Sequence, residues 1–272
     1  MRQHFDYDGR RMSYLEVPAS SEHVTGTLVL LHAFPLAATM WEPQFGALPA
    51  GWRLVAPDLA GFGQSSPGTS ASPAMADYAR DVLALMDHLH LDAAVVGGLS
   101  MGGYLVFALH RLAPKRLRGL VLADTRPEAD SEHARALRAQ TLETLDREGP
   151  AGVAEAMLPK LLGRTSREKK ADLVAWVREV ASGQPAEGIR RAVLSLKGRP
   201  DSTPTLREID APTLILAGEE DEITGPDLAQ QMHGQVAGSE LVLVPGAGHL
   251  TNLEQPGPFN SALSRFLSTR FP

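Results

Sequence analysis

Short apolar runs recur along the chain and alternate with stretches in which apolar residues are three or four positions apart. The runs are almost continuously apolar and end in Gly, Pro, Asp or Thr, a pattern typical of β-strands covered on both faces. They lie at residues 27–33, 53–57, 93–99, 117–125, 213–218 and 240–245. Because helical patterns separate them, we expect an α/β fold with a mostly parallel central sheet flanked by helices.

The ends of the chain add a hairpin and a helix to this pattern. Two short strands, 4–7 and 12–17, flank Asp8-Gly9, a strong hairpin signal that predicts an antiparallel pair at one edge of the sheet. The clearest helical stripe lies in 75–91, and a last helix is expected over about 258–267.

The alternation of strands and helices stops between about residues 126 and 205. This segment is helical in pattern, highly charged and slightly basic, whereas the rest of the chain is acidic. This charge has two interpretations. It is typical of solvated helix faces, and the alternative is a cap that mildly favours anionic substrates. Its expected apolar positions are Leu137, Leu142, Leu145, Val153, Met157, Leu161, Leu173, Trp176, Val177 and Val180. We expect residues 1–125 and 206–272 to form one core and 126–205 to form an inserted helical cap.

Composition narrows the class of protein. The 272 residues are 43% hydrophobic and 21% charged, as in ordinary globular proteins, and their number suits one α/β domain with an insertion. A net charge of −6 opposes binding to nucleic acid or to an anionic membrane. The first 17 residues lack the apolar run of a signal peptide, and no stretch approaches the ~20 apolar residues of a membrane span. We expect a cytoplasmic protein whose oligomeric state the sequence leaves open.

Metal and thiol chemistry are not expected. The chain has no cysteine, which rules out disulfides, Cys-ligated metal sites and thiol nucleophiles. Its histidines show no ligand spacing, so no metal site is predicted.

A G-x-S-x-G motif at Gly98–Gly102 follows the run at 93–99 and precedes an apolar helical run. In this strand–turn–helix context the motif predicts a sharp turn that exposes the hydroxyl of Ser100 beside a helix N-terminus. The alternative is a packing turn or a phosphate-binding loop. The context favours Ser100 as a nucleophile.

A serine nucleophile needs a base and an acid that orients the base, and both are expected further along the chain. His249 lies in a loop of small residues beyond the run at 240–245, and Asp221 follows the run at 213–218. Acidic neighbours leave three other candidates for the acid, namely Glu219, Glu220 and Glu222.

Two further residues have alternative roles. Asp124 ends the strand after the nucleophile's helix and is the main rival to Asp221, because it could reach the same histidine. His32 is interpreted as structural, with a catalytic role as the alternative.

The backbone N–H groups of Phe34 and Met101 are the expected oxyanion-hole donors.

Five ordered motifs resemble the α/β-hydrolase superfamily over essentially the whole chain. They are the loop at 32–35 (HAFP), the segment 58–65 (DLAGFGQS), the elbow at 98–102 (GLSMG), the acid loop at 218–226 and the Gly-His pair at 248–249. Ala33 departs from the family, which usually has Gly there.

Within the superfamily the chain is similar to carboxylesterases, 3-oxoadipate enol-lactonases and cofactor-free haloperoxidase-like enzymes. The resemblance implies a serine esterase that cleaves small carboxylic esters through an acyl-enzyme, without a cofactor. The alternatives are a lactone hydrolase and a non-catalytic receptor for a small ligand. A lactone hydrolase would lose hydrolysis of a carboxylated enol-lactone when cap arginines such as Arg126, Arg135 or Arg138 are neutralised. Perhydrolysis is expected at most as a side activity.

Overall fold

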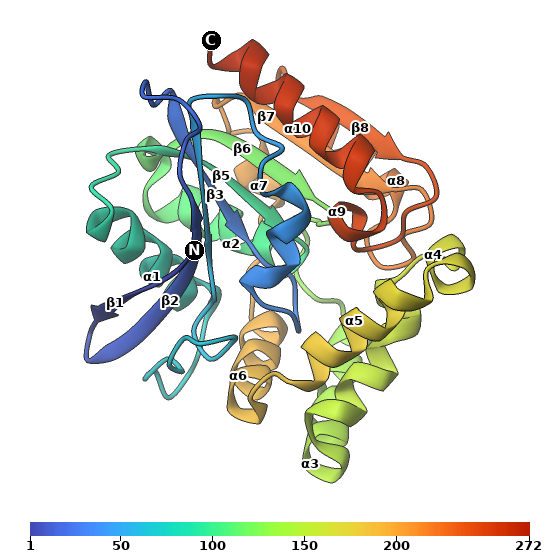
Figure 1. The fold of residues 1–272 in the computed structure, drawn as a ribbon. Coiled ribbons are helices and arrows are strands. Elements are labelled where there is room, and N and C mark those ends of the chain that lie inside the picture. The colour runs from blue at the N-terminus through green and yellow to red at the C-terminus, as the bar shows by residue number, and fades with distance from the viewer.

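The computed structural model describes residues 1–272 and contains one eight-stranded sheet in the order β1-β2-β4-β3-β5-β6-β7-β8 (Figure 1). The strands are β1 (Arg2–Tyr7), β2 (Arg10–Val17), β3 (Gly26–Leu31), β4 (Trp52–Pro57), β5 (Ala94–Leu99), β6 (Leu117–Ala123), β7 (Thr213–Gly218) and β8 (Glu240–Val244). β2 runs antiparallel to both of its neighbours, β1 and β4, and all other neighbouring strands are parallel. The mostly parallel sheet predicted from the sequence is confirmed, and every strand end lies within two residues of its predicted position.

Two hydrophobic cores explain why the strands are apolar throughout. In β3, Val29 and Leu31 pack into one core, whereas Leu28 and Leu30 pack into the other. Successive side chains of a strand point to opposite faces, so a strand covered on both sides must be apolar at every position.

Helices cover both faces of the sheet. The first core includes residues of α1 (Met75–His88), α2 (Met101–Leu112) and α8 (Pro226–His233). The second includes residues of the 3₁₀ helix η1 (Ala38–Gln44) and of α10 (Pro256–Arg270), which follows α9 (Thr251–Glu254). A short 3₁₀ turn, η2 (Pro114–Arg116), links α2 to β6. None of the helices is long and apolar enough to cross a bilayer.

The N-terminal hairpin forms the edge of the sheet, as predicted. β1 pairs with β2 from Arg2↔Leu15 to Tyr7↔Arg10, which leaves Asp8 and Gly9 as the two turn residues. Both have positive φ, 51° and 68°. This is the conformation that a two-residue hairpin turn requires and that Asp-Gly adopts readily.

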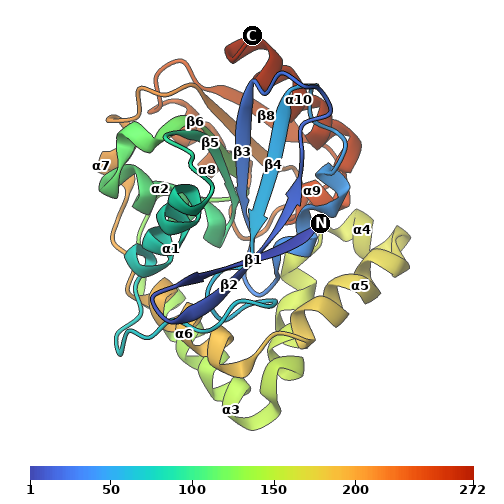
Figure 2. The same ribbon diagram turned by 60° about the vertical axis from the view of Figure 1, so that its left-hand side comes forward.

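Five helices lie between β6 and β7: α3 (Glu132–Leu161), α4 (Arg164–Lys169), α5 (Ala171–Ser182), α6 (Ala186–Lys197) and α7 (Thr203–Leu206). We call residues 126–205 the cap segment; these boundaries stay a prediction. Helices α3–α6 gather at the end of the sheet toward which the arrow of β4 points (Figure 2). Of the apolar positions expected here, Leu145, Val153, Leu161 and Val177 are buried, whereas Leu137 is exposed.

On one side the cap segment packs against the loop after β4 by direct backbone contact. A Cβ atom on Gly188 would lie 1.9 Å from the carbonyl oxygen of Gly61, so no other residue fits at position 188 without moving the backbone. Next to this contact, Gly63 N donates a 2.9 Å hydrogen bond to the side chain of Gln184. Arg191 donates to the carbonyl oxygen of Ser70 at 2.6 Å.

A buried ionic cluster joins the two connections of the cap segment. Asp130, before α3, accepts hydrogen bonds from Arg138 at 3.1 Å and from Arg199, which follows α6. Asp130 is 4% exposed and the side chain of Arg199 is 3% exposed. Burial would raise the pKa of Asp130, but the neighbouring arginines lower it below its ordinary value. The carboxylate is therefore the charge that neutralises the buried Arg199.

Replacing Asp130 should destabilise the protein strongly. Asp130→Ala leaves Arg199 buried and unpaired, which typically costs about 3–5 kcal/mol in the free energy of unfolding. The matched control is Asp146→Ala, because Asp146 pairs with Arg190 on the exposed surface of the same segment, where such pairs contribute about 0–1 kcal/mol. Urea unfolding of both variants measures the difference. Equal losses would contradict the role of the buried cluster.

Candidate active site

Ser100 lies at the sharp turn between β5 and α2. Its backbone has φ 56° and ψ −110°, a left-handed conformation that is strained for a residue with a side chain. Gly98 and Gly102 make the turn possible, because a Cβ on Gly98 would lie 2.1 Å from the carbonyl carbon of Gly102. Thr125 supports the turn by donating a 2.9 Å hydrogen bond to the carbonyl oxygen of Ser100. The strand–turn–helix context read from the sequence is present.

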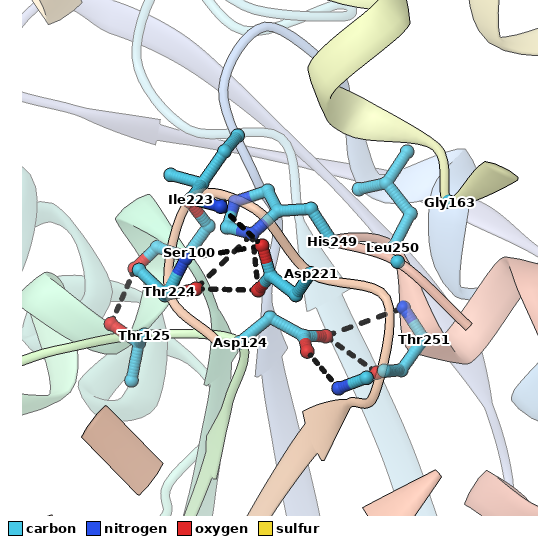
Figure 3. A network of polar contacts seen from close by, with 12 residues as sticks. Ser100, Asp124, Thr125, Gly163, Asp221, Ile223, Thr224, His249, Leu250 and Thr251 are labelled. Atoms are coloured by element: carbon cyan, nitrogen blue, oxygen red, sulfur yellow. Dashed lines mark hydrogen bonds and ion pairs between the residues drawn. The ribbon is translucent and has the colours of Figure 1, made fainter. Parts of the chain in front are cut away.

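The structure brings Ser100, His249 and Asp221 into one hydrogen-bonded chain (Figure 3). His249 Nε2 lies 2.7 Å from Ser100 Oγ, and His249 Nδ1 lies 2.9 Å from Asp221 Oδ2. The serine is contributed by the end of β5, the aspartate by the end of β7 and the histidine by the loop after β8. Residues 149 positions apart thus meet at the carboxyl end of the sheet.

Asp221 is held as a carboxylate by its surroundings. Its Oδ1 accepts from the backbone N–H groups of Ile223 at 2.7 Å and Thr224 at 3.1 Å, and its Oδ2 accepts from the Thr224 hydroxyl at 2.7 Å. Burial would raise the pKa of Asp221, but His249 and these donors lower it to about 2. Asp221 is therefore negatively charged at neutral pH.

The interaction between Asp221 and His249 lowers the pKa of Asp221 but raises the pKa of His249. Burial would lower the pKa of this 2% exposed imidazole, but the charge of Asp221 and the hydrogen bond to it raise the pKa above its ordinary value. Asp124 and Glu254 add to the rise. His249 is thus a stronger base than a free imidazole.

The other acids of the loop after β7 do not contact His249. Glu220 turns to the cap segment, where its carboxylate accepts from the N–H of Thr165 at 2.7 Å and from its hydroxyl at 2.5 Å. Glu219 and Glu222 are exposed. Asp221 alone of the four acids in this loop bonds the histidine.

Asp124 is fully buried beside the chain of three residues but bonds other partners. Its carboxyl group accepts from Gly218 N at 3.0 Å and from the Thr251 hydroxyl at 2.5 Å, which joins the end of β6 to β7 and α9. Burial and the nearby charge of Asp221 raise the pKa of Asp124 well above its ordinary value. No hydrogen bond connects Asp124 to His249.

His32 connects two loops at the carboxyl ends of the strands. Leu59 N donates to His32 Nε2 at 3.0 Å, so the ring hydrogen must lie on Nδ1, which is 2.9 Å from the carbonyl oxygen of Ala33. Complete burial lowers the pKa of His32 to about 4. A neutral ring with both nitrogens engaged supports the structural interpretation of His32.

The N–H groups of Phe34 and Met101 have no backbone acceptor. Met101 is the first residue of α2, where the N–H groups of a helix lack intrahelical partners. The Phe34 N–H belongs to the loop that leaves β3. Both donors are therefore available to an external oxygen atom.

Thr224 and Glu254 are two polar residues of this region that the sequence analysis did not single out. The Thr224 hydroxyl donates to Asp221 and also lies 3.2 Å from His249 Nδ1. A threonine three residues after an aspartate in a turn is a weak signal that could have marked it. No group of three or more His, Asp or Glu side chains is placed to hold a metal ion.

Comparisons with known proteins agree with this architecture. Residues 26–256 match the family model described as the alpha/beta hydrolase fold. The chain is 30% identical to a putative carbamate hydrolase, RutD, of Variovorax paradoxus over 234 residues, which cover 85% of this chain and 88% of the relative.

Two solved structures are similar over nearly their whole length. A thermophilic esterase from Thermogutta terrifontis superposes with a TM-score of 0.91 and 34% identity, with 100% of both chains covered. The enol-lactonase from Burkholderia xenovorans superposes with a TM-score of 0.88 and 26% identity, with 98% of this chain and 100% of that chain covered. With its mostly parallel sheet, its serine at the turn after β5 and this family match, the chain belongs to the α/β-hydrolase fold family.

Proposed function

We propose that the protein is a serine hydrolase that cleaves small carboxylic esters. Ser100 is the nucleophile, His249 the general base and Asp221 the residue that orients the base, while the N–H groups of Phe34 and Met101 form the oxyanion hole. The 2.7 Å approach of His249 Nε2 to Ser100 Oγ carries this proposal, because it is the geometry that proton transfer from the hydroxyl requires. The cap segment covers the site as an inserted helical layer.

In the first half of the reaction, His249 Nε2 takes the proton of Ser100 as Oγ attacks the ester carbonyl carbon. The carbonyl oxygen becomes an oxyanion that accepts from Phe34 N and Met101 N. The protonated His249, stabilised by Asp221, gives its proton to the alcohol oxygen as the C–O bond breaks. An acyl-Ser100 ester and a free alcohol result.

In the second half a water molecule replaces the alcohol. His249 removes one proton from the water molecule as the water oxygen attacks the acyl carbon. The oxyanion forms again and accepts from the same two N–H groups of the oxyanion hole. Collapse breaks the bond to Ser100 Oγ, which recovers its proton from His249 and releases the carboxylic acid.

The first experiment measures initial rates with p-nitrophenyl esters of two to twelve acyl carbons, in parallel with Ser100→Ala. Fast, Ser100-dependent turnover of short esters supports the proposal. Uniformly feeble turnover would contradict it and would direct attention to a dedicated lactone or to ligand binding without catalysis.

A lactone hydrolase is the second candidate, favoured by the similarity to an enol-lactonase structure. Of the cap arginines expected to attract a lactone carboxylate, Arg126 and Arg138 already face the buried Asp130, whereas Arg135 is exposed. Arg135→Gln is therefore the informative variant. A raised KM of this variant for a carboxylated enol-lactone, with unchanged KM for a neutral ester, would support the lactonase.

The pH dependence of kcat/KM should follow the protonation of His249. The base must be neutral to accept the serine proton, and its pKa is raised above the ordinary 6.5. We expect kcat/KM to rise with pH and to reach half its maximum above pH 6.5. Steady-state rates with one short ester between pH 5 and 9 measure this rise of kcat/KM, which is the acid limb of the pH profile. A midpoint clearly below 6.5 would contradict the electrostatics of the Asp221–His249 pair.

A further inference from the structure

Glu254 is the last residue of α9, the short helix that follows the loop of His249. Its side chain is completely buried. A carboxylate in a protein interior is tolerated only where hydrogen-bond donors replace its lost water. The partners of Glu254 therefore indicate what this residue does.

One carboxylate oxygen of Glu254 holds both neighbours of His249. Oε1 accepts from Gly248 N at 2.9 Å and from Leu250 N at 3.1 Å. The N–H groups of the residues immediately before and after His249 are thus bound to a single atom, which restricts the backbone of this loop and the direction of the His249 ring.

The other oxygen holds the cap segment. Oε2 accepts from Gly163 N at 2.8 Å, and Gly163 is the residue immediately before α4. The backbone carbonyl of Glu254 also accepts from the ammonium group of Lys170, at the start of α5. The Oε2 atom and the backbone carbonyl of Glu254 therefore bind the cap segment, while Oε1 binds the loop that carries His249, here called the histidine loop.

The backbones that Glu254 joins are in direct contact. A Cβ on Gly248 would lie 2.2 Å from Gly163 N, and a Cβ on Gly163 would lie 2.7 Å from Gly248 N. Figure 3 shows Gly163 near Leu250, beside the network of His249 and Asp221. Since no side chain separates the two segments, a displacement of the turn at Gly163 is transmitted to the histidine loop.

We propose that Glu254 is a positioning residue, which aligns His249 with Ser100 and couples this alignment to the docking of the cap segment. The inference rests on the proposed role of His249 as general base. The charge of Glu254 also faces the imidazole, together with Asp221 from the loop after β7 and Asp124 from the end of β6. All three carboxyl groups favour the protonated ring, and Lys170 is the cation bound to the backbone of residue 254.

The test replaces Glu254 with Gln in the full chain. A glutamine has one acceptor oxygen, so its NH₂ group must face either Gly163 N or the pair Gly248 N and Leu250 N, donor against donor. We expect kcat/KM for a short ester to fall about 10- to 100-fold, as a small misplacement of a catalytic group does. The acid limb of the pH profile should shift to lower pH, because a negative charge near His249 is lost.

The matched control is Asn252→Ala. Asn252 is on the same short helix and equally buried, but its amide donates to Met40 O at 2.7 Å and to Gln44 Oε1 at 3.1 Å, away from the histidine loop. We expect both variants to lose thermal stability, whereas only Glu254→Gln should change kcat/KM and the pH profile. If Glu254→Gln keeps kcat/KM within twofold of the native value with an unmoved acid limb, the proposal is overturned.

Two further measurements keep the test decisive if Glu254→Gln does not fold. Glu254→Asp keeps the charge but shortens the side chain, so kcat/KM should fall while the acid limb stays in place. In the unaltered protein, hydrogen exchange by NMR should find the amides of Gly163, Gly248 and Leu250 strongly protected. Rapid exchange at these three amides would overturn the proposal without any variant.

The outcomes separate this inference from the proposed function. If the native protein shows no Ser100-dependent ester cleavage, the proposed function fails, whatever the amide exchange shows. If the native protein is active and Glu254→Gln behaves as Asn252→Ala does, the proposed function stands and the positioning role of Glu254 fails.

Discussion

Ser100→Ala should lower kcat for a short p-nitrophenyl ester by about 10⁶-fold, because the attacking oxygen is removed and water must react directly. His249→Ala should cost about as much, since an unassisted hydroxyl is a poor nucleophile. The residual rate, still about 10³- to 10⁴-fold above that in water, would come from substrate binding and the two N–H donors of the oxyanion hole.

The double variant Ser100→Ala/His249→Ala provides the control for this prediction. Residues that act as a unit are not additive, so the double variant should be no slower than either single variant. Thermal unfolding must show that all three proteins are folded. Retention of more than a few per cent of native kcat by either single variant would refute the proposed mechanism.

Asp221→Asn should lower kcat by about 10⁴-fold with little change of structure. The asparagine amide can donate to His249 Nδ1, which moves the ring hydrogen to Nε2 and removes the lone pair that must accept the serine proton. The charge that stabilises the protonated imidazole is lost as well, so the pKa of His249 should fall. Steady-state rates and the pH profile of kcat/KM measure both effects.

The matched control is Asp124→Asn, which changes the other buried aspartate near His249. Asp124 bonds Gly218 N and Thr251 rather than the imidazole, so this substitution leaves the hydrogen bond between Asp221 and His249 in place. We expect this variant to keep kcat within about tenfold of the native value, an effect comparable with the loss of a supporting hydrogen bond. If the two substitutions exchanged their effects, the orienting acid would be Asp124 and the assignment to Asp221 would be wrong.

The parallel sheet could be predicted from the sequence because its signals are local. A strand buried on both faces must be apolar at every position, as in β3, β5 and β7, and a two-residue turn needs residues such as Asp8 and Gly9 that tolerate positive φ. The helix predicted over 75–91 ends at His88, three residues earlier, since apolar periodicity locates the ends of a helix poorly.

The candidate site could be predicted as far as chemistry and chain order determine it. A serine between glycines after a buried strand, an aspartate after a later strand and a histidine after the last strand must meet at one edge, because parallel strands end there together. This argument could not choose among Asp221, its acidic neighbours and Asp124. Side-chain direction decides that choice, and Asp221 alone of these lies within hydrogen-bond distance of His249.

The sequence by itself determined the α/β architecture, the edge hairpin and the serine and histidine that come together, whereas the choice of the acid needed the structure. Only the tertiary structure decided the contacts between segments distant in the chain, namely the pairing of Asp130 with Arg199 and the three amides bound by Glu254. The physical reason is that apolar periodicity and turn residues act over a few positions. The partners of a buried charge, by contrast, are selected by the fold as a whole, wherever its packing brings donors within about 3 Å.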